Sequence, residues 1–501
     1  MTEALPTLDL KQVDFRVLPM RTRFPFKYGI ASLTALPHLV LQATVEINGT
    51  LADGITSEGL PPKWFTKAPD TTFEQDLPAM LAVIENAVNV ALASPSTTFF
   101  NLWRNLYDEQ VAWASAEGHP PLLANLGVSL VERALLDALC RHLGRPIHKV
   151  IRENLLGIRL GDVRPELNDL SLAEALPQKP RSTIIARHTI GLGDPLTSDD
   201  VTDETRADDT LPLDLESCIR SYKLNYFKIK VCGQLESDLP RLRKLAETLG
   251  PEARFTLDGN EQYPSISAFR EHWEAWREED SLRTFLDGGL LLVEQPAHRD
   301  ETFAPAVADD FSSWPERPSF IIDEADGSLD SLPNALDLGY DGASHKNCKG
   351  IVKGIANAAT LAQAEASRER PVHLSGEDLA NVGPIALLQD LAIMATLGIE
   401  HVERNGHHYF KGLSAWPEPV RETILAHHGD LYHRHPEGYP TLRIENGLLN
   451  LNTLNAAPFG PAPNLDFSAL AEVKLSDSNS FIQEGLHTVQ TTFRSKKLSF
   501  I

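Results

Sequence analysis

The chain has 501 residues, of which 42% are hydrophobic and 23% charged, a balance typical of soluble globular proteins. This length predicts two domains, one of them large. The formal net charge of −23 argues against a nucleic-acid partner, because binding to phosphates requires a basic surface.

The cysteines and the apolar segments set further limits. Four cysteines are present, at Cys140, Cys218, Cys232 and Cys348. They form no Cys-x-x-Cys pair, so we expect neither a disulfide framework nor a zinc knuckle. The N-terminus lacks the pattern of a signal peptide, and no uninterrupted apolar run approaches the ~18 residues of a membrane helix. We therefore expect a cytoplasmic protein without a membrane partner.

Residues 1–150 are predicted to form an α+β domain. Two β-rich stretches come first, at 13–20 and 39–47, and Asn48-Gly49 is a turn dipeptide that favours a hairpin. Between the two stretches, Arg23–Gly29 is expected to be a loop with exposed aromatic side chains. Helical patterns follow over about 72–94, 97–116 and 121–143.

Residues 182–430 show a different rhythm, in which apolar runs alternate with helical stretches. Most runs are separated by roughly 25–35 residues, enough for a strand and a crossover helix. The strand candidates lie near 183–190, 224–231, 254–258, 290–294, 319–323, 341–346, 371–375 and 400–404. Eight successive βα units predict a closed (β/α)8 barrel. The first unit contains an acidic insertion, 194–214, which is expected to be a mobile loop at the mouth of the barrel or a surface excursion.

Residues 431–501 form a C-terminal segment of another style. Thr441–Leu451 predicts a hairpin around Asn446-Gly447, which we expect to pack on the N-terminal domain. The residues after about 475 are polar and weakly patterned. The predicted fold is an α/β protein, in which a (β/α)8-type barrel carries an α+β N-terminal capping domain that the C-terminal segment completes.

Three acidic residues each end one of the predicted barrel strands. They are Asp258, Glu294 and Asp323, and Glu324 follows the last. Functional residues of such barrels lie at the carboxyl ends of the strands, and neighbouring strands are ~4.8 Å apart. The carboxylates can therefore converge on one cation, and oxygen ligands suit Mg²⁺. The alternative is that each acid caps a helix or faces solvent.

Two lysines lie two residues apart in the run Tyr226–Val231. Because a strand alternates its faces, Lys228 and Lys230 point the same way, and the apolar residues between and beside them suit the helix side. A closed barrel has no edge, so the lysines are expected to face the lumen near its mouth. A desolvated lysine beside another cation can act as a base. We expect Lys230 to accept the proton and Lys228 to be its electrostatic partner; surface lysines are the alternative.

Together these motifs resemble those of the enolase superfamily, in its mandelate racemase and muconate lactonizing enzyme branch. The matching residues are the lysine pair Lys228 and Lys230, the metal ligands Asp258, Glu294 and Asp323, and the polar residue Asn260. The resemblance implies a small-molecule carboxylate substrate and a divalent metal, usually Mg²⁺. A base then removes the proton α to the carboxylate, and the metal stabilises the enediolate that forms.

The N-terminal domain contains further matches. Arg23–Gly29 and Gly54–Gly59 resemble the specificity loops of the family's capping domain, and Ser129–Ala138 resembles the helix that precedes the barrel. Phe26 and Tyr28 indicate that part of the bound ligand is apolar. The resemblance covers almost the whole chain but identifies no substrate. By analogy it also implies a symmetric homo-oligomer.

The sixth barrel strand departs from the family pattern. Members with a lysine pair carry a second lysine here, whereas this chain has Ser344 at that place. Lys346 lies two residues further on, so it faces the same side one step nearer the mouth. We expect Lys346 to be the opposing acid or base, with Lys349 as a second candidate. His345 is expected to point to the other face.

The seventh and eighth strands offer polar groups. In the racemase type, a strand-seven histidine is the second base and pairs with a strand-six aspartate. His373 is the candidate here, although Asp341 precedes the strand-six position; a packed histidine is the alternative. Glu403 is expected to bind the far end of the substrate, or to belong to a hydrogen-bonded loop.

Three functions follow from these residues. The leading one is a racemase or epimerase with Lys230 and Lys346 on opposite faces of the α-carbon. The second is a lyase of the same superfamily, an acid-sugar dehydratase or cycloisomerase, with one lysine as base and the metal or His373 assisting the leaving group. The third, suggested by the altered sixth strand, is a barrel that binds a carboxylate and Mg²⁺ without turnover.

Overall fold

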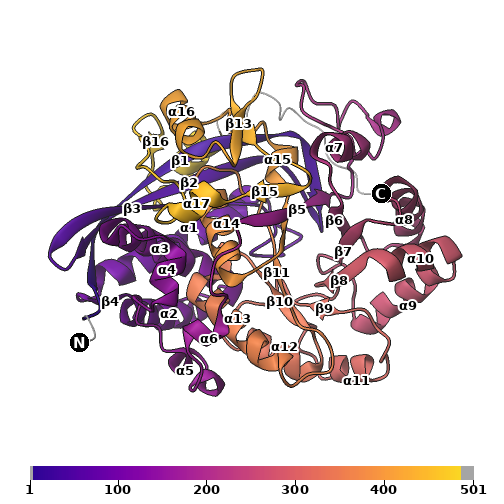
Figure 1. Cartoon of the computed structure of the whole chain (residues 1–501), viewed down its shortest axis with the longest axis horizontal. Coiled ribbons are helices and arrows are strands. Elements are labelled where there is room, and N and C mark those ends of the chain that lie inside the picture. Colours follow the sequence, from indigo (N-terminus) through magenta and orange to yellow (C-terminus); the bar gives the residue numbers. More distant parts are fainter. Residues whose placement is uncertain (1–3, 487–501) are drawn as a thin grey trace.

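The N-terminal domain is an antiparallel sheet covered by helices (Figure 1). The structure is a computed structural model that describes residues 4–486. Strands β1 (Thr7–Tyr28), β2 (Ala31–Ile47) and β3 (Thr50–Gly59) pair in chain order. The short strand β4 (Thr97–Thr98) pairs with β1. Helices α1 (Phe73–Ala93), α2 (Phe99–Ala116) and α3 (Pro121–Leu143) pack on one another, and α3 lies along β2 and β3.

The stretch predicted to be a loop with exposed aromatics belongs to β1, and its aromatic side chains are buried. Phe24 and Phe26 pack against the ring of Tyr409, which follows the last barrel strand. The pairing with β2 shifts between Arg21 and Phe26, so the strand continues past Pro25 through a bulge. Pro25 is compatible with this strand, because a bulge accommodates a residue that cannot donate a backbone hydrogen bond to the neighbouring strand.

Eight parallel strands form the barrel, close to the predicted positions. They are β5 (Thr183–Ile190), β6 (Tyr226–Lys230), β7 (Arg254–Asp258), β8 (Leu290–Glu294), β9 (Phe320–Ile321), β10 (Gly342–His345), β11 (His373–Gly376) and β12 (His401–Arg404). Strand β12 pairs with β5, so the first and last strands are neighbours. Between β9 and β10 the wall closes through the bridge Ile322–Ala343 and flanking backbone hydrogen bonds.

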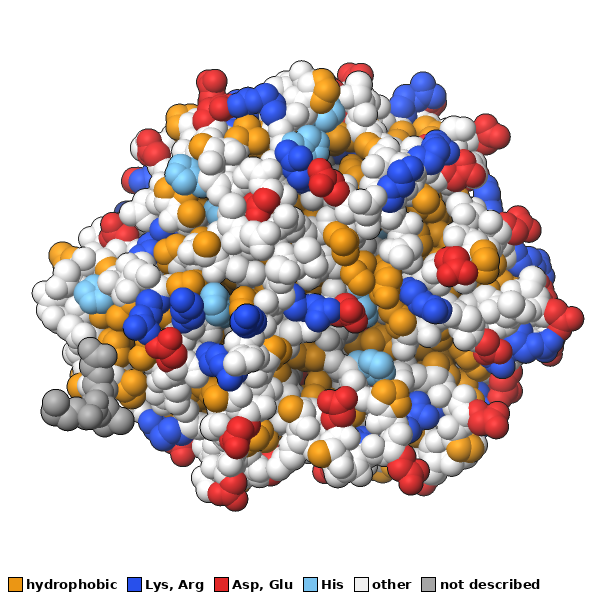
Figure 2. Space-filling model, viewed as in Figure 1, with side chains coloured by type: hydrophobic (Ala, Val, Ile, Leu, Met, Phe, Trp, Pro, Cys, Tyr) orange, Lys and Arg blue, Asp and Glu red, His pale blue; other side chains and the backbone are white. Residues whose placement is uncertain are grey.

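Helices follow the barrel strands and cover the outside of the wall (Figure 1). They are α7 (Leu215–Tyr222), α8 (Leu235–Leu249), α9 (Ile266–Arg277), α10 (Asp280–Gly289), α11 (Ala306–Ser312), α12 (Ser331–Leu338), α13 (Ile351–Glu365), α14 (Ala386–Leu397), α15 (Gly406–Tyr409) and α16 (Glu418–His427). Three short helices connect the domains: α4 (Ile147–Arg152), α5 (Leu160–Val163) and α6 (Leu172–Ala175). Figure 2 shows one face of the molecule, on which acidic and basic side chains are interspersed.

The acidic insertion is held against the N-terminal domain by a buried ion pair. Arg23 Nη2 lies 2.7 Å from Asp209 Oδ1, and neither side chain is more than 2% exposed. The same guanidinium donates to the carbonyl oxygens of Leu211 and Pro212. The insertion is therefore docked, not the surface excursion that its composition predicted. Its partner lies in β1, far away in the sequence, and composition carries no information about it.

The C-terminal segment divides between the two domains. Strands β13 (Tyr432–Arg434) and β14 (Pro440–Leu442) pair with each other, whereas β15 (Leu448–Asn450) pairs with barrel strand β5. The predicted hairpin therefore packs on the barrel and not on the N-terminal domain. After α17 (Asn452–Ala456), β16 (Ala471–Glu472) pairs with β1, and α18 (Ser478–Leu486) lies against β1 and β2. Of the tail, 487–501 lie outside the described residues.

Within the described chain, one helix is long and apolar enough to cross a membrane, as judged by length and composition alone. It is α1, and 50% of its most apolar window is buried. The helix packs against α2 and α3 within the N-terminal domain. This packing accounts for its apolar face as part of a domain core.

Gly54 provides a test of the contact between β3 and α3. A Cβ atom at Gly54 would lie 2.0 Å from the carbonyl oxygen of Ala134, so the backbones can approach only without a side chain. We expect Gly54→Ala to lower the free energy of unfolding by about 1–3 kcal/mol through overpacking, as measured by urea unfolding. Gly288→Ala is the matched control, since nothing lies within 4 Å of its Cβ position. Equal stability of the two variants would contradict the close contact.

Candidate active site

Lys228 lies at the centre of the barrel mouth, surrounded by carboxylates. Its Nζ is 2.9 Å from Asp258 Oδ2, 2.7 Å from Glu294 Oε2, 2.7 Å from Glu377 Oε2 and 3.1 Å from Glu403 Oε2. All five side chains are buried. Register explains part of this convergence, because Asp258 pairs with Lys230 on one side and with Glu294 on the other.

Burial and these contacts set the charges of the cluster. Burial alone would lower the pKa of Lys228, but its carboxylates hold it well above the ordinary value. Burial, reinforced by Asp258 and Glu377, raises the pKa of Glu294 well above its usual range. Burial also opposes ionisation of Asp258 and Glu403, but Lys228 outweighs it and lowers the pKa of both. Glu294 is therefore the member of the group whose pKa is shifted toward the protonated form.

Two further lysines face each other across the lumen. Lys230 Nζ lies 2.5 Å from Asp258 Oδ2, and Lys346 Nζ lies 2.5 Å from Asp323 Oδ2. Lys230 ends β6 and Lys346 directly follows β10. These are four strands apart in an eight-strand order, so they lie on opposite walls. The two ammonium groups therefore approach the same space from opposite sides.

A cavity occupies the space between these lysines. It encloses about 370 Å³, part of it open to solvent. Its barrel wall includes Lys230, Lys346 and Asn260, and the N-terminal domain closes it with the rings of Phe26, Tyr28 and Trp64. Lys346 Nζ lies 4.4 Å from the centre of the Trp64 ring, a cation–π contact. The cavity thus combines an aromatic wall with charged groups.

The altered sixth strand builds a polar network around Asp323. The Ser344 hydroxyl donates to the Asp323 carboxylate and accepts a 2.7 Å hydrogen bond from Lys349. Lys349 Nζ is also 2.8 Å from Asp323 Oδ1, so its ammonium is engaged in the wall, whereas Lys346 reaches the cavity. Burial opposes ionisation of Asp323, but Lys346 and Lys349 hold its pKa well below the usual value. Lys346 is therefore the strand-six lysine that faces the cavity.

The two predicted histidines lie away from the cavity. His345 points to the helix side, as expected, and its ring lies against Gly354 of α13. His373 pairs with Gly342 at the first residues of β11 and β10, which is the amino-terminal end of the barrel. Asp341 and Arg370 are its charged neighbours there. The structure thus does not place His373 with the other candidates, because strand seven reaches the mouth only four residues later, at Glu377.

The remaining predicted residues lie around the mouth. Asn260 Nδ2 donates to Glu324 Oε1 at 3.2 Å, and burial, reinforced by Asp323, raises the pKa of Glu324 to about 7. The Tyr28 hydroxyl donates to the carbonyl oxygen of Pro62 at 2.9 Å, which fixes its ring beside the cavity. Glu403 accepts a 2.7 Å hydrogen bond from the Thr189 hydroxyl in addition to its contact with Lys228.

The donor set fits a divalent metal ion. Lys228 Nζ is close to Glu294 Oε2, but the contact lacks hydrogen-bond geometry. Neither carboxylate oxygen of Glu294 has a hydrogen-bond partner within residues 4–486, although the side chain is buried. A buried carboxyl group in this state is stabilised by a proton or by a cation. With Asp258 and Asp323 it offers the oxygen ligands that Mg²⁺ prefers.

Sequence reasoning missed two residues of this site. Glu377 follows β11 and contacts Lys228, and Arg187 in β5 pairs with Glu377 and donates to Ser375 Oγ at 3.0 Å. The sequence contained a signal for each residue. Glu377 directly follows its strand, close to where the predicted metal ligands lie on theirs, and Arg187 interrupts an apolar run on the lumen side.

Comparison with known proteins gave matches among solved structures. Searches of family models and of curated sequences gave none. A mandelate racemase/muconate lactonizing protein from Herpetosiphon aurantiacus has a TM-score of 0.59 and 16% identity, over 91% of this chain and 99% of that one. An enolase from Bradyrhizobium, solved with magnesium and mandelic acid, has a TM-score of 0.57 and 16% identity, over 95% and 100%. A dipeptide epimerase from Enterococcus faecalis V583, solved with Mg and L-Leu-L-Tyr, has a TM-score of 0.56 and 14% identity, over 88% and 97%.

These matches are matches of fold. They extend over nearly the whole chain, across both the N-terminal domain and the barrel. The protein therefore has the fold of the mandelate racemase and muconate lactonizing enzyme branch of the enolase superfamily. This confirms the similarity that the lysine pair and the strand-end acids predicted.

Replacing Lys228 tests the charge balance of the site. Lys228→Met removes the cation that several buried carboxylates share, so we expect the free energy of unfolding to fall by about 3–5 kcal/mol in chelator. Millimolar Mg²⁺ is expected to restore part of this loss, because a bound cation stabilises the folded state. Urea unfolding with and without Mg²⁺ measures both effects.

The matched control is Lys244→Met. Lys244 pairs with Asp200 at the surface, where the side chains are 43% and 32% exposed. Its replacement is expected to change stability by less than about 1 kcal/mol, with no response to Mg²⁺. A Lys228→Met protein as stable as this control would show that the cluster does not depend on its central lysine.

Proposed function

We propose that the protein is a Mg²⁺-dependent racemase or epimerase that removes and returns the proton α to the carboxylate of a small-molecule substrate. The observation that carries this proposal is the placement of Lys230 and Lys346 on opposite walls of one cavity. Inversion at a carbon requires a proton acceptor on one face and a proton donor on the other. A one-base elimination does not require the second lysine.

Asp258, Glu294 and Asp323 are the residues that would hold the metal ion. When bound, the ion supplies positive charge to the substrate carboxylate as negative charge develops on its oxygens. The altered sixth strand does not remove a ligand from this set, since Asp323 keeps its place at the end of strand five of the barrel.

The lysines have separate tasks in this proposal. Lys228 stays protonated because the surrounding carboxylates raise its pKa more than burial lowers it. It is therefore a permanent positive charge among these carboxylates. Lys346 also has a raised pKa, since Asp323 outweighs the opposing effect of burial, and it starts as the proton donor. Lys230, on the facing wall, is the proton acceptor and takes up the proton as a neutral amine. The reverse reaction exchanges the two tasks.

The cavity favours a small acid with an apolar side. Phe26, Tyr28 and Trp64 form its aromatic wall, and Glu403 and Asn405 provide polar contacts opposite the metal ligands. Mandelic acid and a dipeptide occupy the compared proteins, and both are carboxylates that carry a hydrogen on the α-carbon. Acid sugars, N-acyl amino acids and dipeptides are therefore the substrate classes to screen.

Exchange of the α-proton in D₂O tests the lysine assignments. With Mg²⁺ and a substrate of either configuration, NMR is expected to show deuterium uptake with inversion. Lys230→Ala is expected to slow exchange from one configuration by at least about 10²-fold, and Lys346→Ala to slow exchange from the other. The exposed Lys244→Ala is the control and should retain both rates.

The other outcomes identify the competing functions. An eliminated or cyclised product that persists in Lys346→Ala would identify a lyase with a single base. Failure of any acid to exchange its α-proton, in protein with Mg²⁺ demonstrably bound, would identify a non-catalytic barrel. Either result contradicts the racemase or epimerase proposal.

A further inference from the structure

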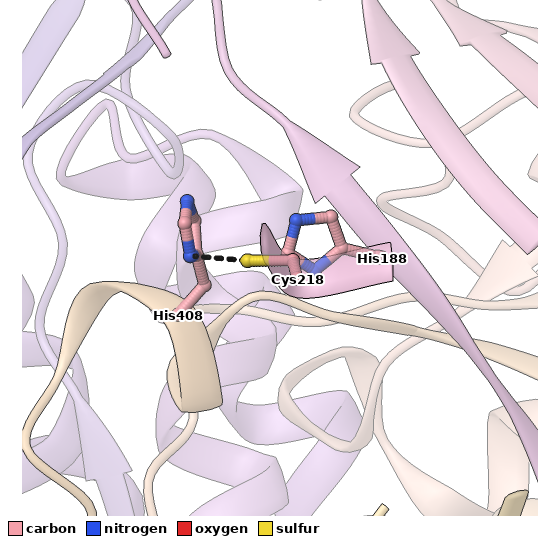
Figure 3. Close-up of side chains that lie close together, drawn as sticks. All are labelled: His188, Cys218 and His408. Atoms are coloured by element: carbon pink, nitrogen blue, oxygen red, sulfur yellow. Dashed lines mark hydrogen bonds between the residues drawn. The ribbon is translucent and has the colours of Figure 1, made fainter. Parts of the chain in front are cut away.

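A second group of metal-binding side chains lies outside the barrel lumen. His188 of β5, Cys218 of α7 and His408 of α15 meet there (Figure 3). One ligand atom from each residue lies within 4.8 Å of the others, and the residues are 1%, 0% and 3% exposed. Arg187 reaches Glu377 in the lumen, so the alternation of β5 turns His188 to the helix side of the wall.

The separation of two of these atoms matches tetrahedral coordination. Cys218 Sγ lies 3.6 Å from His408 Nδ1. Zinc–sulfur and zinc–nitrogen bonds of about 2.3 and 2.0–2.1 Å at a tetrahedral angle place S and N about 3.6 Å apart. Figure 3 shows the thiol and the His408 ring pointing toward each other, with the His188 ring beside the sulfur. The ligand atom of His188 lies within 4.8 Å of both.

The outer nitrogens of both histidines have partners of the kind found around metal sites. His188 Nδ1 lies 3.1 Å from His407 Nε2, which leaves Nε2 of His188 for a metal. His408 Nε2 lies 3.8 Å from Asp194 Oδ2, which leaves its Nδ1. Asp194 is buried, and its Oδ1 has no hydrogen-bond partner in the described part of the chain. A hydrogen bond like that between His188 and His407 orients a metal-binding histidine, whereas Asp194 at 3.8 Å supplies a negative charge beside His408 and no hydrogen bond.

We propose that His188, Cys218 and His408 form a structural Zn²⁺ site, distinct from the Mg²⁺ site of the proposed function. Sulfur and imidazole donors favour zinc over Mg²⁺. Mg²⁺ prefers oxygen donors such as the carboxylates of the lumen. The Cys218 thiol gives up its proton on binding, and the Asp194 carboxylate offsets the remaining positive charge. A water molecule takes the fourth position.

The site would join parts of the chain that are distant in sequence. Cys218 and His408 are 190 residues apart. His188 lies on the first barrel strand, Cys218 on the helix after the acidic insertion, and His408 just after the last barrel strand. A zinc ion here ties the insertion to the seam where β5 and β12 meet. This role is structural, because the donors are fully enclosed and face away from the cavity.

Metal analysis of the full-length protein tests the site. Protein purified without chelator and kept in excess Mg²⁺ is expected to retain about one zinc ion per chain, as measured by mass spectrometry of the metals. Replacement by Co²⁺ is expected to give the thiolate-to-cobalt absorption band and the visible bands of a tetrahedral site. The carboxylates of the lumen cannot produce the thiolate band, and its loss in Cys218→Ser would assign it to Cys218 among the four free cysteines.

Matched variants complete the design. Cys218→Ser and His408→Gln are expected to lose the zinc and the cobalt band, while Cys140→Ser, a change at another buried cysteine, retains both. Circular dichroism establishes that each variant is folded, and His188→Gln replaces any variant that is not. Zinc is expected to raise the melting temperature of the unmodified protein by several degrees. A folded, cobalt-treated protein without the thiolate band, or zinc content unchanged in Cys218→Ser, would overturn the proposal.

Discussion

Four carboxylates share one buried ammonium group at the barrel mouth. This balance of buried charges constrains how the barrel strands can pair. Unpaired charges of this kind are unstable in a protein interior, so the strands must keep the register that brings Asp258, Glu294 and Lys228 together. Other cations complete the compensation. Glu377 also pairs with Arg187, and Asp323, outside the group of four, pairs with Lys346 and Lys349. The lumen is thus a network of alternating charges that holds several lysines and acids around one small cavity.

The N-terminal domain stabilises this mouth from outside the barrel. Glu132 of α3 accepts 2.7 Å hydrogen bonds from the backbone N–H groups of Ile351 and Val352, at the start of α13. That helix begins directly after the segment that carries Lys346 and Lys349, so α3 fixes the position of the altered sixth strand. A buried ion pair between Arg133 and Glu58 ties α3 to β3 in turn. The domain therefore both closes the cavity with aromatic rings and positions one of its lysines.

Much of the barrel follows from local patterns, and the exceptions have physical causes. Strand-end acids and the lysine pair are predictable because parallel strands deliver their carboxyl ends to one mouth. The buried end of β1 was not predictable. Pro25 and Gly29 are typical of a turn, and the aromatic rings pack against Tyr409, which is distant in the sequence. His373 was misplaced because the polar residue of strand seven that reaches the mouth is Glu377, and alternation alone cannot decide how far a strand extends. Cys218 carries no sequence signal, because its neighbours come from β5 and α15.

The pairing of β16 with β1 has a consequence for how the protein is made. Arg16 donates to the carbonyl oxygen of Leu470, 454 residues away, so the N-terminal sheet gains this strand only after the whole barrel has been synthesised. Strand β5 likewise receives β12 and β15 late. Vectorial folding on the ribosome therefore cannot complete the N-terminal domain before the barrel has been made. During that interval the nascent chain presents an open sheet edge, which makes chaperone engagement and synthesis rate part of its folding.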